Sequence, residues 1–97
     1  MITHIVLFKL KDASPGNIEK TRNVLQGLDG KVPQLRRLEV GVDVIRSVRS
    51  YDIALVAKFD SLKDLDAYQK HPVHVKVAEY INSVKESAFA VDYESVN

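Results

Sequence analysis

Apolar and polar residues alternate in four stretches of this chain, and apolar residues recur three or four positions apart in three others. Alternation with period two is typical of strands, and the longer spacing is typical of helices with one buried face. The pattern predicts strands at about 2–10, 35–44, 52–59 and 88–93, and helices at about 15–29, 62–68 and 72–84. With the last two helices read as one broken helix, the order is β-α-β-β-α-β. It predicts an α+β, ferredoxin-like fold with a four-stranded antiparallel sheet and its helices on one face.

Local sequence signals predict where the helices begin and end. Ser14-Pro15 combines a residue that accepts hydrogen bonds at a helix start with a proline suited to the first helical turn. Asp29-Gly30 predicts the end of that helix, because glycine readily adopts the left-handed conformation that follows a helix. Ser61, three residues before Asp64, resembles a capping box. Pro72 predicts a break between two helices, because the residue before a proline avoids the helical region.

The first and third predicted strands are apolar on both faces. In the first strand, Ile5 and Leu7 lie opposite Val6 and Phe8, and in the third strand residues 53–59 are apolar on one side and carry Ala54 and Val56 on the other. Helices on one side of a sheet cannot cover both faces, and contiguous apolar patches of this kind usually mark an interface. The simplest cover is a second copy of the chain, which predicts a homodimer that pairs sheet against sheet.

Composition limits the classes of function. The chain has 97 residues, 45% of them hydrophobic, which suits one compact domain over residues 1–97. Its formal net charge is +1, and arginines at 36, 37, 46 and 49 are interleaved with acidic residues, so we expect no nucleic-acid partner. No run approaches the roughly 18 apolar residues of a membrane helix, and the apolar start carries His4 and Lys9 without a basic leader. We therefore expect a soluble, cytoplasmic protein without a membrane partner.

The seven residues from Tyr68 to His74 are the strongest candidate for chemistry. They read Tyr68-Gln69-Lys70-His71-Pro72-Val73-His74, so two of the three histidines lie at the predicted helix junction. If Pro72 opens the next helix, His74 lies at the edge of its buried stripe, where a pocket mouth would be.

Five segments together resemble the stress-responsive A/B barrel (Dabb) family over nearly the whole chain. They are His4-Ile5-Val6-Leu7-Phe8-Lys9, Asp52-Ile53-Ala54-Leu55, Phe59 before Ser61, the Tyr68–His74 stretch, and Val91-Asp92-Tyr93. The resemblance implies a ferredoxin-like monomer that pairs into a dimeric α/β barrel. Many members have no assigned activity, plant members are linked to stress responses, and one plant member is a cofactor-free polyketide cyclase. The histidine and tyrosine that this cyclase uses correspond to His74 and Tyr68.

The chemistry of these side chains fits that correspondence. The pKa of histidine, about 6.5 when unperturbed, suits a general base that removes a proton from carbon between two carbonyls, which is the predicted role of His74. Tyr68 would then donate a hydrogen bond to the oxygen where negative charge develops. The alternative is structural, with His74 and Tyr68 fixing the helix junction through hydrogen bonds to each other or to the backbone.

Three further residues are candidates for ligand binding. His4 and Phe8 share one face of the first strand, where His4 either lines a pocket from the sheet side or is a core histidine with a partner. His71 is a candidate of the same kind, although its position before a proline favours a role in capping the helix. No third ligand accompanies His71 and His74, no glycine-rich phosphate loop is present, and there are no cysteines, so we expect neither a metal nor a cofactor.

Three functional hypotheses remain open at this point. The first is a homodimer that binds a small apolar or aromatic molecule between sheet and helices. The second is a cofactor-free cyclase or isomerase that uses His74 and Tyr68. The third is a structural oligomer without a ligand, in which packing would seal these two side chains.

Overall fold

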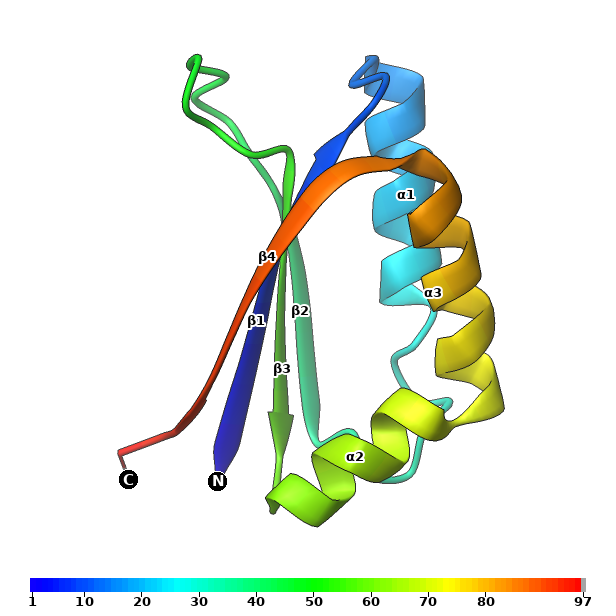
Figure 1. Cartoon of the computed structure of the whole chain (residues 1–97), viewed down its shortest axis with the longest axis vertical. Helices are drawn as coiled ribbons and strands as arrows, with labels where there is room; N and C mark the ends of the chain where they lie inside the picture. Colours follow the sequence, from blue (N-terminus) through cyan, green and yellow to red (C-terminus); the bar gives the residue numbers. More distant parts are fainter. Residues whose placement is uncertain (97) are drawn as a thin grey trace.

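The computed structural model describes residues 1–96 and has a four-stranded antiparallel sheet with three helices on one of its faces (Figure 1). The elements are β1 (Ile2–Leu10), α1 (Pro15–Gln26), β2 (Arg37–Val42), β3 (Ile53–Phe59), α2 (Leu62–Lys70), α3 (Pro72–Val84) and β4 (Lys85–Glu94). The strands lie in the order β2-β3-β1-β4, which confirms the predicted ferredoxin-like fold. Asn97, the last residue of the predicted domain, lies outside the described residues. None of the helices within residues 1–96 has both the length and the apolar character that a membrane span requires.

The core lies between the sheet and the helices. Every second residue of β3 is buried there, and so are Phe8 and Leu10 of β1. The helices add Leu25 of α1, Tyr68 of α2 and Ile81 of α3. Burying a large apolar side chain contributes about 1.5–3 kcal/mol, so this layer supplies most of the free energy that holds the helices on the sheet.

The predicted start of α1 is correct and its predicted end is wrong. Ser14 Oγ accepts a hydrogen bond from the Asn17 backbone N–H at 3.4 Å, as the sequence predicts for a helix cap. The helix ends at Gln26, however, three residues before Asp29-Gly30. Tighter turns follow, in which the Leu28 N–H donates to the Leu25 carbonyl at 3.1 Å. Because Leu28 is buried against the same core, the apolar pattern continues past the end of the helix.

The edge strands also differ from their predicted bounds. β2 is shorter than predicted, and Val44 lies in the following loop instead of on the strand face. β4 is longer and begins at Lys85, directly after α3. Its pairing with β1, which runs from Leu10 opposite Lys85 to Ile2 opposite Glu94, sets this length. The length of a strand depends on its pairing with a neighbouring strand, which the local sequence pattern does not show.

Among the described residues, no helix covers the second face of the sheet in the single chain (Figure 1). The strand register places Leu7 beside Phe89 and Ala54 on this face, and Ile5 beside Val91 and Val56. Phe89 is 64% exposed, and Leu7, Val91 and Tyr93 are exposed as well. We call these residues and their neighbours on β1, β3 and β4 the open face. The sequence predicted the contributions of β1 and β3, and the structure adds those of β4.

Candidate functional site

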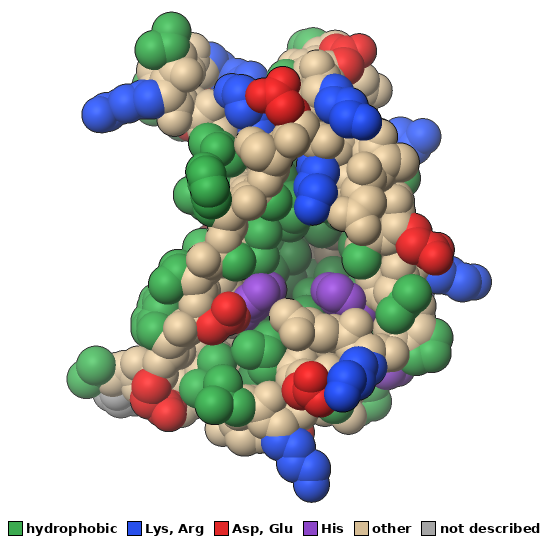
Figure 2. Space-filling view, in the orientation of Figure 1, with side chains coloured by type: hydrophobic (Ala, Val, Ile, Leu, Met, Phe, Trp, Pro, Cys, Tyr) green, Lys and Arg blue, Asp and Glu red, His purple; other side chains and the backbone are tan. Residues whose placement is uncertain are grey.

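A cavity of about 230 Å³ lies between the sheet and the helices. Figure 2 shows it as a hollow with an apolar floor and two histidine side chains at its edge. Most of its lining is aliphatic or aromatic and includes Phe8, Leu55 and Ile81. The polar side chains of the lining are His4, Tyr68, Gln69, His74, Asn82 and Lys85. An apolar pocket with a few convergent polar groups is the usual form of a small-molecule site.

The break between α2 and α3 positions Tyr68 and His74. His71 is the last residue before Pro72 and has an extended backbone, so α2 ends there and α3 begins. Its Nδ1 accepts a hydrogen bond from the Val73 backbone N–H at 3.1 Å, which caps α3. The junction brings the rings of Tyr68 and His74 together, with their centroids 4.4 Å apart. The Tyr68 ring also packs on Phe59 of β3, with ring centroids 4.8 Å apart.

The backbone defines the protonation of His74. Its Nδ1 lies 3.2 Å from the carbonyl oxygen of Gln69. Because a carbonyl oxygen only accepts hydrogen bonds, Nδ1 carries the proton in this contact. In the neutral imidazole, the lone pair is then on Nε2, which is the atom available to take a proton.

His4 has a carboxylate partner. The register of β1 and β4 places His4 opposite Asp92, and His4 Nδ1 pairs with Asp92 Oδ1. An ionised carboxylate accepts a hydrogen bond from Nδ1–H, which orients the ring. The His4 ring lies edge-on to Tyr68, with centroids 6.4 Å apart, so Tyr68 contacts both imidazoles.

Burial shifts the pKa of two of these groups. Desolvation lowers the pKa of His74, the hydrogen bond to Gln69 opposes this shift, and the nearby His4 lowers the pKa further. Desolvation also raises the pKa of Tyr68 well above its usual range. At neutral pH, His74 is therefore a neutral base and Tyr68 a hydrogen-bond donor. Tyr68 lines the cavity with a side chain that is only 1% exposed.

The structure brings together four of the five residues singled out in the sequence. His4, Phe8, Tyr68 and His74 line the cavity, whereas His71 lies outside it and caps α3. The prediction of His71 as a ligand-binding residue therefore has no support from its position. Asp92 was missed as a partner of His4. The alternation of β4, which places residues 88, 90 and 92 on the helix side, is the signal that would have found it.

We expect the imidazole of His74 to titrate below the ordinary pKa of about 6.5. Because its pKa is lower in the folded than in the unfolded state, the unfolded chain binds more protons in the window between the two values. The contribution of His74 to the free energy of unfolding is then complete above about pH 6.5 and decreases as pH falls toward the folded pKa.

Proton NMR of the imidazole Cε1–H measures this titration. In thermal unfolding, His74→Gln should lose less stability than the parent protein as pH falls below about 6.5. An imidazole midpoint at or above the ordinary pKa would contradict the burial argument.

The fold and the site define a ferredoxin-like α+β protein with a histidine-lined cavity beneath its helices. The chain belongs to the Stress Responsive A/B Barrel Domain family, whose family model matches residues 2–95. This confirms the resemblance found in the sequence.

Individual relatives agree with this assignment. The chain is 30% identical over 98 residues to the Stress-response A/B barrel domain-containing protein DABB1 of Arabidopsis thaliana, covering 96% of this chain and 46% of that protein. The chain thus spans about half the length of this curated relative.

Two solved structures are also similar. One is a dimeric protein of unknown function with a ferredoxin-like fold from Bacteroides fragilis NCTC 9343, at 34% identity and a TM-score of 0.82, covering 97% of this chain and 95% of that one. The other is a dimeric ferredoxin-like protein of unknown function from Thermobifida fusca YX, at 31% identity and a TM-score of 0.84, covering 95% of this chain and 88% of that one.

Proposed function

We propose that this chain forms a homodimer through its open face and binds a small apolar or aromatic molecule in the cavity between sheet and helices. The observation that carries the binding proposal is the cavity itself, whose floor is apolar and whose edge holds His4, Tyr68 and His74. His74 lines this cavity and is only half-buried, which favours binding over the hypothesis of a purely structural oligomer, in which packing would seal it. Tyr68, at 1% exposure, does not separate the two hypotheses.

The size of the cavity limits the ligand. At about 230 Å³ it is smaller than the roughly 300–1,000 Å³ of most ligand pockets. It is larger than an apolar cavity of about 150 Å³ that holds benzene in another protein. These volumes favour a molecule about the size of one substituted aromatic ring. The imidazoles and the Tyr68 hydroxyl would orient a carbonyl or hydroxyl group on that ring.

The open face supports the pairing. Its apolar side chains on β1 and β4 are exposed in the single chain, and both similar solved structures are described as dimeric. At about 25 cal/mol per Å² of apolar surface, burying roughly 400 Å² on each of two copies contributes on the order of 20 kcal/mol before the costs of association.

A substitution that fills the cavity tests the binding proposal. Ala78 lines the cavity from α3, so Ala78→Phe should occupy the space that the ligand needs. Titration with 4-methylphenol, followed by NMR, should shift resonances of the cavity residues in the parent protein. The affinity for 4-methylphenol should be at least about tenfold weaker in the variant, a change of about 1.4 kcal/mol.

Val75→Phe is the matched control, because Val75 is exposed on the same helix and does not line the cavity. Native mass spectrometry of the purified parent would identify a molecule that is already bound. Equal affinity of the parent and Ala78→Phe for 4-methylphenol would contradict binding in this cavity.

The second candidate function is a cofactor-free cyclase or isomerase that acts on a polyketide-like carbonyl compound. The neutral His74 beside the Tyr68 ring favours it, because a base and a donor to developing oxygen charge are the two groups that enolate formation needs.

A further inference from the structure

The loop between β2 and β3 presents aliphatic side chains to solvent. We call residues 43–52 the β2–β3 loop. Val44 is 87% exposed, Ile45 75% and Val48 102%. In Figure 1 the loop leans away from the helices, toward the side of the open face. Three neighbouring aliphatic side chains at this exposure form an apolar tip that the single chain does not cover.

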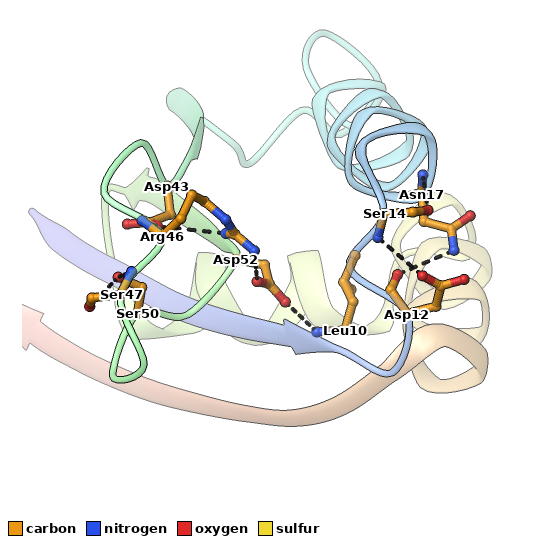
Figure 3. A network of polar contacts seen from close by, with 9 residues as sticks. All are labelled: Leu10, Asp12, Ser14, Asn17, Asp43, Arg46, Ser47, Ser50 and Asp52. Atoms are coloured by element: carbon orange, nitrogen blue, oxygen red, sulfur yellow. Dashed lines mark hydrogen bonds and ion pairs between the residues drawn. The ribbon is translucent and has the colours of Figure 1, made fainter.

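Polar contacts hold this loop in one shape (Figure 3). Asp43 Oδ2 accepts a hydrogen bond from the Arg46 backbone N–H at 2.7 Å, and the Arg46 guanidinium donates to Asp52 Oδ1 at 2.9 Å. The buried Asp52 also accepts from the Leu10 backbone N–H at 2.7 Å, which ties the loop to β1. At the tip, the Ser47 backbone N–H donates to Ser50 Oγ at 3.1 Å.

The Arg46 backbone has a conformation that the surrounding contacts of the loop must hold in place. Its φ is 58°, in the left-handed region that residues other than glycine seldom adopt. Such a conformation costs about 1–3 kcal/mol and persists when surrounding contacts determine it. The loop thus keeps its apolar tip in a fixed position, which lowers the entropy lost when the tip docks on a partner.

A hollow connects the loop with the open face. It has a volume of about 350 Å³, and its walls include Leu7 and Ala54 of the open face and Arg49 and Tyr51 of the loop. The apolar surface of the sheet therefore continues into the base of the loop. A second copy placed on the open face would lie beside this hollow and within reach of the tip.

We infer that the β2–β3 loop is a docking arm whose apolar tip packs on the second copy of this chain when two open faces pair. This inference rests on the proposed homodimer. Lipid is a less suitable partner, because attraction to anionic lipid needs an excess of positive charge. The loop has two arginines and two aspartates, and Arg46 forms ion pairs with both aspartates.

Thiol labelling tests the position of the tip, because the chain has no natural cysteine. The reference protein is the double variant Val48→Cys/Phe89→Glu, which we expect to be monomeric. The thiol of Val48→Cys alone should react with a maleimide dye at least about tenfold more slowly than the same thiol in the double variant. Leu62→Cys is the matched control, because Leu62 is 66% exposed on α2, on the helix side of the sheet. Its thiol should react at the same rate in both backgrounds.

The outcomes separate this inference from the pairing on which it rests. A dimeric Val48→Cys protein whose thiol reacts as fast as in the monomer overturns the docking arm and leaves the pairing in place. A monomeric parent protein at micromolar concentration overturns both. Protection of Val48→Cys by phosphatidylserine vesicles, without protection in the dimer, identifies a lipid-binding loop and also overturns the inference.

Discussion

Phe89→Glu should convert the proposed homodimer into a folded monomer. Phe89 lies on β4 at the open face beside Leu7, and it is exposed in the single chain, so the change removes little from the core. In a two-fold dimer the substitution occurs twice, and each carboxylate would lose water without gaining a partner. Burying an unpaired ion costs several kcal/mol, so the dissociation constant should rise at least about a thousandfold.

Light scattering coupled to size-exclusion chromatography at micromolar concentration measures the change. Leu62→Glu adds the same charge to an exposed apolar position on α2 and should leave the dimer intact. Circular dichroism checks that both variants keep the fold. If Phe89→Glu stays dimeric, the pairing uses another surface, and the proposed cover of the open face is wrong.

His74→Ala should remove most of any proton abstraction that the protein catalyses. Nε2 of His74 is the basic nitrogen in this cavity whose ring is fixed by a backbone carbonyl, and its lowered pKa keeps it neutral at pH 7. A positioned general base contributes about 10²–10⁴ in rate. Exchange of the acidic methylene protons of a 3,5-diketo thioester for deuterium, followed by NMR, measures this step without knowledge of the natural product.

The control is His71→Ala, which removes an imidazole three residues away that lies outside the cavity and caps α3. It should lower stability by about 0.5–2 kcal/mol, as lost helix caps do, and leave the exchange rate of the folded protein unchanged. Equal exchange rates in the parent and His74→Ala would exclude His74 as the base. Binding without turnover would then remain as the proposed function.

Much of the fold follows from local sequence. Ser14-Pro15 and His71-Pro72 start helices where the sequence predicts, because hydrogen-bonding side chains and proline act on their immediate neighbours. Alternation in β1 and β3 predicts both a core face and an apolar open face. The predicted end of α1 at Asp29-Gly30 is wrong, because the buried Leu28 follows the helical pattern although the backbone has already turned.

The candidate site was only partly predictable. The motif from Tyr68 to His74 identified two of its side chains, and the alternation of β1 identified His4 and Phe8. The position of His71 before Pro72 favoured the capping role that the structure shows, whereas the place of His74 in the cavity depends on how α3 packs against the sheet. The sequence left open whether His74 bonds to Tyr68 or to the backbone, and it did not identify the Gln69 carbonyl as the partner, a backbone group that any residue would supply.

The sequence by itself determined the order of the elements, the breaks between helices and the apolar character of both sheet faces, because these depend on neighbours within about one helical turn or a few strand residues. Only the tertiary structure decided the pairing of His4 with Asp92, the cavity beneath the helices and the shape of the β2–β3 loop. Each of these joins residues that are distant along the chain or depends on strand register. A shift of one residue in the register of β1 and β4 would move Asp92 to the other face and leave His4 without its partner.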